Sequence, residues 1–256
     1  MNRSPFLRFG LSLGLVVLYL ACSKSDDDPT PTTTTTTTST DVPVVYKKLY
    51  GASNVYVEGD YIVVRTTNVP DHKSPYFKGT KWESTQYEAY NGTGTFAANP
   101  NTITQQNLVF RLPRTPKEAT TKQETPLGPI GVSINGVVFF NQYAAGRSAL
   151  TMEILGFDQY GGHPQQQGQY HYHVEPTYLT KKVGKDALLG FLLDGFPVYG
   201  PQENGKTITN TDLDKYHGHV GKTADYPDGI YHYHITDADP YLNGSGFYGT
   251  PGTVSQ

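Results

Sequence analysis

The sequence predicts a mainly β protein: an antiparallel sandwich- or barrel-like domain with long loops, preceded by a disordered N-terminal tether. The chain of 256 residues contains 27 glycines, 18 prolines and 20 tyrosines, a composition that favours strands and turns over helices. Short apolar runs alternate with turn residues along most of its length. No segment keeps a helical period of apolar residues over three turns.

The N-terminus has the features of a targeting segment. Arg3 and Arg8 are followed by an apolar stretch from Leu11 to Leu20, which is too short for a transmembrane helix. We therefore predict a signal peptide over residues 1–21. Cys22, the only cysteine, resembles the acylated (palmitate-bearing) cysteine of a bacterial lipoprotein, although Tyr19 replaces the usual leucine. An ordinary secretory signal with an incidental cysteine is the alternative.

Residues 22–41 are predicted to be a tether. The acidic run Asp26–Asp28 resembles the surface-export signal of Bacteroidetes lipoproteins, and Pro29–Thr40 is nearly all threonine, which cannot build a core. These features predict an outer-membrane lipoprotein, exposed at the cell surface and attached to the membrane through a lipid at Cys22.

The remaining residues, 42–256, are predicted to form one β-rich domain without a disulfide, because no cysteine follows Cys22. The formal net charge is −3, and removal of residues 1–21 with their two arginines leaves −5. The domain has no basic patch, which excludes nucleic acid as an expected partner.

Two early segments predict strands. Val55–Val57 and Tyr61–Val64 flank the turn Glu58-Gly59-Asp60 and predict a hairpin. Leu108–Leu112 predicts a further strand that ends at Pro113.

The strongest hairpin signal is Asn135-Gly136, which lies between the apolar runs Ile130–Ile134 and Val137–Phe140. Leu188–Leu193 is apolar throughout and predicts a buried strand. The following residues, 194–201, predict a turn that reverses the chain.

A phrase of alternating tyrosine and histidine occurs twice, at Tyr170–His173 and Tyr231–His234. Each copy follows a Gly-His pair, Gly162-His163 or Gly218-His219, so six of the eight histidines lie in two units. In both units an aspartate stands five positions before the upstream histidine. Chance rarely repeats a pattern of this length, and the units therefore indicate an internal duplication.

Alternation with period two predicts that the histidines of each phrase share one face of a strand and the tyrosines the other. Neighbours two apart lie roughly 6.6 Å apart along a strand, and two imidazoles can converge from there on an ion about 2.0–2.1 Å from each nitrogen. We therefore predict binding of a transition metal, zinc or copper. The predicted ligands are His163, His171, His173, His219, His232 and His234.

The number of metal centres is left open by the sequence. Each unit can build its own three-histidine site, or both units can contribute to one shared centre. We expect the two histidine strands to lie close together.

Three carboxylates near the units are candidate supporting groups. Asp158 and Asp214 occupy matched positions and either hold the second nitrogen of a ligand imidazole or cap a turn. Glu153 is a candidate general base for a metal-bound water, with an ordinary surface position as the alternative.

Three further residues are weaker candidates. Asp194 begins a Gly-Phe-Pro turn and is expected to be structural. His72 lies in a loop from which it can join a site at a distance. His217 is excluded because Gly161 stands at its position in the first unit.

Several motifs together resemble the YHYH domain family, over residues 68–248. These are Pro70-Asp71-His72, Pro129–Val137, Leu193–Pro201, Asp239-Pro240-Tyr241 and the two Gly-His plus Tyr-His-Tyr-His units. The family pattern often has a cysteine two residues after the aspartate of each unit, where this chain has Tyr160 and Tyr216. The resemblance implies an exported domain that lacks the family's disulfide, and it implies no settled chemistry.

Three functions are compatible with these residues, and whether the protein is an enzyme is left open. The first is a surface-anchored domain that binds zinc or copper. The second is a metal-dependent hydrolase or oxidoreductase at the same site, with the histidines as ligands and Glu153 or an aspartate as base. The third is a module that binds a glycan, a small molecule or a cell-surface partner without metal. Histidine ligation predicts that metal affinity falls below about pH 6.

Overall fold

The computed structural model of the protein describes residues 41–256. The predicted signal peptide, Cys22 and residues 22–40 of the predicted tether lie outside the described residues. In the described part of the chain, no helix has the length and apolar character needed to span a membrane.

A four-stranded sheet contains the first predicted hairpin. Its strands, in spatial order, are β1 (Asn54–Glu58), β2 (Tyr61–Thr66), β3 (Leu108–Pro113) and β14 (Thr253–Ser255), and all of its pairings are antiparallel. Gly59 closes the β1–β2 turn with a φ of 57°, in the left-handed region that glycine tolerates best. The predictions for this hairpin and for β3 are confirmed.

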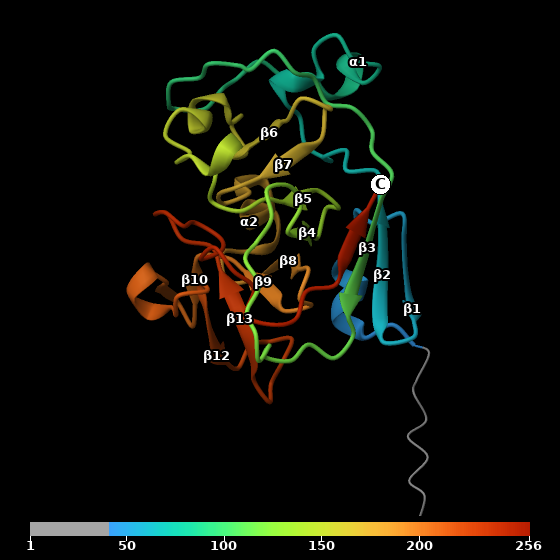
Figure 1. The fold of residues 1–256 in the computed structure, drawn as a ribbon. Coiled ribbons are helices and arrows are strands. Elements are labelled where there is room, and N and C mark those ends of the chain that lie inside the picture. Colours follow the sequence, from blue (N-terminus) through green and yellow to red (C-terminus); the bar gives the residue numbers. More distant parts are fainter. Residues whose placement is uncertain (1–40) are drawn as a thin grey trace, which may run out of the picture. The chain divides into compact units, whose positions relative to one another are not determined.

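A second sheet has eight strands and carries both histidine units (Figure 1). In spatial order these are β12 (Gly218–Gly221), β13 (Ile230–His234), β9 (Pro197–Tyr199), β8 (Leu188–Leu192), β4 (Gly131–Ser133), β5 (Val138–Phe139), β7 (Tyr170–Tyr172) and β6 (Gly162–Pro164). Two pairings, β5 with β7 and β9 with β13, are parallel, and the others are antiparallel. The sheet ends at β12 and β6 without closing, so the barrel form of the prediction is wrong, whereas the mainly β class is confirmed.

The remaining elements are short. They are α1 (Glu83–Gln86), α2 (Thr177–Val183), the hairpin of β10 (Gln202–Glu203) with β11 (Lys206–Thr207), and the 3-10 helices η1 (Val44–Lys48), η2 (Pro75–Phe77), η3 (Ala145–Arg147), η4 (Glu153–Gly156) and η5 (Asn210–Asp212).

The eight-stranded sheet has an internal pseudo-twofold arrangement. Each half consists of a hairpin, a parallel partner strand and an antiparallel edge strand: β4–β5, β7 and β6 in one half, and β8–β9, β13 and β12 in the other. The halves meet where β4 pairs with β8, in a register centred on Val132 opposite Phe191. The duplication therefore includes the preceding hairpins as well as the histidine units.

One apolar core joins the two sheets. Ile62 and Phe110 of the smaller sheet belong to the same buried cluster as Val132 and Phe191 of the larger one. Tyr46 of η1 stacks on Phe191 with 4.2 Å between ring centroids, and aromatic pairs of this kind stabilise by about 0.5–1.5 kcal/mol beyond their burial.

The two histidine strand pairs lie at opposite ends of the eight-stranded sheet, with β9, β8, β4 and β5 between them (Figure 1). The expectation that they lie close together is wrong. The reason is the β4–β8 pairing, which joins the two halves through their hairpins and leaves the histidine units outermost.

Candidate metal centres

The first centre forms on the antiparallel strand pair of β6 and β7. His163 lies directly opposite His171, and His173 follows on the same face as His171. The 3-10 helix η4 adds Glu153. The ligand atoms of Glu153, His163, His171 and His173 all lie within 4.8 Å of one another, and we call this group centre 1.

The distances in centre 1 fit a small cation. Nε2 of His171 is 3.0 Å from Nε2 of His173, and Oε1 of Glu153 is 3.1 Å from Nε2 of His163 and 3.7 Å from Nε2 of His173. Ligands at 2.0–2.1 Å in a tetrahedron are separated from one another by about 3.3 Å. The four groups could therefore hold a metal ion.

The second centre repeats this arrangement at the other end of the sheet. His219 on β12 lies opposite His232 on β13, with 3.0 Å between their Nε2 atoms. His234 lies on the same strand, and Glu203 of β10 places Oε1 3.2 Å from His232 Nε2 and 3.6 Å from His219 Nε2. Glu203, His219, His232 and His234 form a second group within 4.8 Å, centre 2.

The other ring nitrogen of four histidines faces a backbone carbonyl. Nδ1 of His171 and His173 lies 3.0 and 2.5 Å from the carbonyls of residues 169 and 141. Nδ1 of His232 and His234 lies 3.0 and 2.7 Å from those of residues 230 and 200. A carbonyl only accepts, so Nδ1 donates, and in the neutral ring Nε2 then has a bare lone pair. Bare lone pairs 3.0 Å apart repel each other unless a cation lies between them.

Burial favours the neutral form of His163, His171, His232 and His234. Desolvation lowers the pKa of His171 well below its ordinary value of about 6.5, and the neighbouring His163 and His173 add to the effect. Burial likewise lowers the pKa of His163 and His232, and it lowers the pKa of His234 to about 3. The predicted loss of metal affinity at low pH stays a prediction.

Aromatic rings pack against histidines of both centres. Phe140 stacks on His171 with 3.9 Å between centroids, and Phe157 lies parallel to His173 at 5.6 Å. Tyr199 contacts His232 edge-on at 5.3 Å. Apolar rings beside a site lower the local dielectric constant and strengthen electrostatic interactions within it.

Asp158 and Asp214 cap turns and hold no imidazole. Asp158 accepts from the backbone N–H of Tyr160 at 2.9 Å and from the hydroxyls of Ser74 and Tyr170 at 2.6 and 2.8 Å. Asp214 accepts from the N–H of Tyr216 at 2.8 Å and from the hydroxyl of Tyr231 at 2.9 Å. The supporting-group role is wrong for both, because each carboxylate lies with the tyrosines on the face opposite the histidines.

Glu153 was recognised in the sequence as a possible base, and the structure places it among the histidines. Burial alone would raise its pKa, but its interactions with the nearby His163 and His173 outweigh burial and lower the pKa to about 2. Its partner Glu203 was not predicted. The repeat gives no signal for Glu203, because Glu153 precedes the aspartate of its unit by five residues and Glu203 precedes Asp214 by eleven.

The other two histidines lie outside both groups. His72 is buried among tyrosine rings, and its Nε2 is 3.0 Å from the Tyr172 hydroxyl. His217 has a φ of 75° at the position where Gly161 has a φ of 83°, and its Nε2 is 3.0 Å from the Thr236 hydroxyl.

A search with family sequence models matches the YHYH protein family over residues 109–209 and 202–246. The chain belongs to the YHYH family. No curated protein and no solved structure matches it. Both centres of this YHYH domain are built from residues within the matched segments.

Asp194, in the turn of the second hairpin, is fully buried and accepts from the Tyr233 hydroxyl at 2.6 Å and from the N–H of Gly249 at 2.9 Å. It is structural, as expected. Burial raises its pKa to about 6, with these hydrogen bonds opposing the shift.

The raised pKa of Asp194 predicts a pH-dependent stability. The folded state binds this proton more tightly than the unfolded state, so the stability it contributes is complete below about pH 4 and is lost as pH rises through about 6. The loss is on the order of 3 kcal/mol. Urea unfolding of the metal-free protein should show that Asp194→Asn, which copies Asn135 of the first hairpin, costs more at pH 4 than at pH 7. An equal cost at both values would contradict the prediction.

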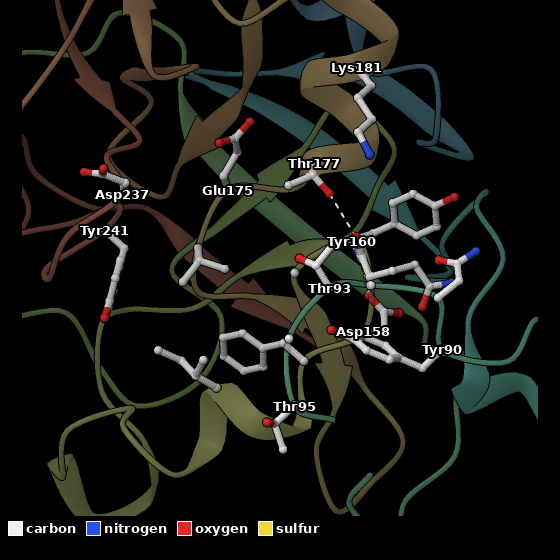
Figure 2. A pocket seen from close by; sticks show the side chains of 18 of the residues that line it. Tyr90, Thr93, Thr95, Asp158, Tyr160, Glu175, Thr177, Lys181, Asp237 and Tyr241 are labelled. Carbon is white, nitrogen blue, oxygen red and sulfur yellow. Dashed lines mark hydrogen bonds between the residues drawn. The ribbon is translucent and has the colours of Figure 1, made fainter. Parts of the chain in front are cut away.

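A cavity of about 830 Å³ adjoins centre 1 (Figure 2). Phe157 lines it and also stacks on His173. Figure 2 shows Asp237 and Tyr241 on one side and Tyr160 and Lys181 on the other. Gln159 also lines the cavity, and its Oε1 is buried without a hydrogen-bond partner among residues 41–256.

Proposed function

We propose that this YHYH domain binds two transition-metal ions, one in each centre, and that zinc is the preferred metal. The observation that carries the proposal is the convergence of the bare Nε2 atoms of His171 and His173, 3.0 Å apart in centre 1, whose Nδ1 atoms donate to carbonyls. In centre 2 the Nδ1 of His232 likewise donates to a carbonyl, and its Nε2 lies 3.0 Å from that of His219. Nε2 of His234 is buried and has no hydrogen-bond partner in the described chain. A buried unpaired nitrogen is costly, and a cation that binds it removes the cost.

Zinc fits these groups better than copper does. Three imidazoles and one carboxylate at near-tetrahedral separations are a usual zinc set, whereas copper(I) prefers sulfur and copper(II) prefers tetragonal geometry. Neither group contains a sulfur atom.

The sequence supports the cellular setting of the proposal. Cleavage before Cys22 and acylation of that residue would anchor the domain in the outer membrane, and the tether would hold it at the cell surface. We infer a surface-anchored metal-binding lipoprotein.

Metal stoichiometry tests the proposal. Residues 41–256, purified without chelator or His-tag and supplied with zinc, should contain two equivalents by elemental analysis. His171→Ala and His232→Ala should each contain one, and the double variant none. His217→Gly is the matched control: it removes a buried histidine outside both groups and installs the glycine found at Gly161, so it should keep two equivalents. A wild-type protein that contains no metal would refute the proposal, and loss of both ions from one single variant would contradict two independent centres.

The cavity beside centre 1 favours a second function, the binding of a small polyhydroxylated ligand such as a saccharide. Tyr160 and Tyr241 offer rings for stacking, and Gln159 Oε1 offers an acceptor for a hydroxyl. Tyr160→Ala should lower the affinity for a glycan identified on an array by about ten-fold, and Tyr160→Phe, which keeps the ring, should lower it by less. A glycan array without hits for the zinc-loaded protein would count against this function.

A further inference from the structure

The amide of Asn99 touches the outer side of centre 1, and its orientation is fixed. Its Oδ1 accepts from the backbone N–H of Asn101 at 2.9 Å, and its Nδ2 donates to the carbonyl of Pro164 at 3.0 Å. A backbone N–H only donates and a carbonyl only accepts, so turning the amide over would lose both bonds.

This orientation decides which nitrogen of His163 carries the proton. Nδ2 of Asn99 also lies 3.1 Å from Nδ1 of His163, and because Nδ2 is a donor, Nδ1 must accept. In the neutral ring the proton is then on Nε2, the atom that faces centre 1. That Nε2 is buried, and although Oε1 of Glu153 is 3.1 Å away, no partner is aligned with it for a hydrogen bond.

The corresponding histidine of centre 2 has no such constraint. Within residues 41–256, the polar contacts of the His219 ring are made by Nε2 alone, with His232 and Glu203. About a quarter of the His219 side chain is exposed, so its Nδ1 can carry the proton and leave Nε2 free to bind a metal.

We propose that the two centres differ in kind, and this inference rests on the proposed metal binding. Centre 2 uses all four of its groups as ligands. Centre 1 uses Glu153, His171 and His173, while the N–H of His163 faces the fourth position and donates to a small oxygen-donor anion, such as a carboxylate, that binds there. Asn99 is the positioning residue that fixes this difference.

The surroundings of centre 1 give such an anion access. A cavity of about 280 Å³ is lined by Asn99, Met152, Glu153 and His163. Three protein ligands with one open position is the arrangement of catalytic zinc sites, and four ligands is that of structural sites. On this inference, centre 1 is the reactive centre and centre 2 the stabilising one.

Cobalt(II) is a suitable probe, because its visible absorption depends on its coordination, whereas zinc has no visible absorption. His232→Ala would leave centre 1 alone, and His171→Ala would leave centre 2 alone. We expect sodium acetate to change the cobalt spectrum of centre 1 and to leave that of centre 2 unchanged. Centre 2 should also bind cobalt at least about ten-fold more tightly, since outer hydrogen-bond partners change metal affinity by 10–100-fold.

Asn99→Asp and Asn99→Ala, each made in the His232→Ala protein, test the positioning role. Aspartate accepts at Nδ1 of His163 and alanine removes the donor, so both free Nε2 for ligation. Both should tighten cobalt binding by about ten-fold and abolish the acetate response. A purely structural role for Asn99 would instead weaken binding.

Three results would overturn the inference. These are equal cobalt affinities without an acetate response at either centre, an acetate response that survives both Asn99 variants, or an acetate response at centre 2 alone. Absence of cobalt from both centres would instead refute the proposed function on which the inference rests.

Discussion

Saturating zinc should raise the thermal unfolding midpoint of the metal-free protein by more than about 15 °C. A ligand at a thousand times its Kd stabilises by about 4.1 kcal/mol per site, so two sites give about 8 kcal/mol. A domain of this size gains roughly 2–4 °C per kcal/mol. Differential scanning calorimetry of residues 41–256, with and without zinc, measures the shift.

The size of the shift should follow the number of intact centres. His171→Ala or His232→Ala should reduce the zinc-dependent rise by roughly half, and His217→Gly should leave it unchanged. Magnesium should have no comparable effect, because it prefers oxygen ligands in octahedral geometry. A midpoint that zinc does not move would show that the imidazoles are stable together without an ion.

The local elements of this fold could be predicted because their signals are local. Asn135-Gly136 and Asp194-Gly195 each lie between apolar runs, and both glycines have positive φ, 80° and 82°, in the turns that the sequence predicts. The alternation of tyrosine and histidine likewise gave the correct faces of β7 and β13, because the two-residue period of a strand needs no tertiary information.

The extent of the duplication was underestimated, although its signal is present. Ile134-Asn135-Gly136-Val137 and Leu193-Asp194-Gly195-Phe196 share one pattern and hold matched positions before the two histidine units. In the structure these hairpins supply the carbonyls of Asn141 and Gly200 to His173 and His234. A longer repeat would have predicted that each unit carries its own support, and thus two centres.

The order of strands could not be read from the sequence. Whether the two halves meet through their hairpins or through their histidine strands depends on which edges bury more apolar surface together. The buried faces of β4 and β8 settle it, with Val132 and Phe191 fully buried at the junction. The role of Glu203 could not be predicted for a similar reason: the β10 hairpin brings it to His232, which is 29 positions away in the chain.

Replacing Asp158 should destabilise the protein by about 3–5 kcal/mol, and replacing Asp214 by only about 1 kcal/mol. Asp158→Ala leaves the hydroxyls of Ser74 and Tyr170, both fully buried, without their hydrogen-bond acceptor. Each unsatisfied buried group costs about 1–3 kcal/mol. Asp214 is exposed, so water can replace its carboxylate in Asp214→Ala.

Urea unfolding of both alanine variants, in metal-free buffer, compares the same turn-capping role at two levels of burial. Asp158→Asn should recover much of the loss, because both hydroxyls can rotate to accept from its amide. All three variants should keep two equivalents of zinc, since neither aspartate contacts a candidate ligand. Loss of zinc from Asp158→Asn together with unchanged stability would reverse the assignment and make Asp158 a support of the metal site. Equal destabilisation by the two alanine variants would show that burial does not set the strength of these turns.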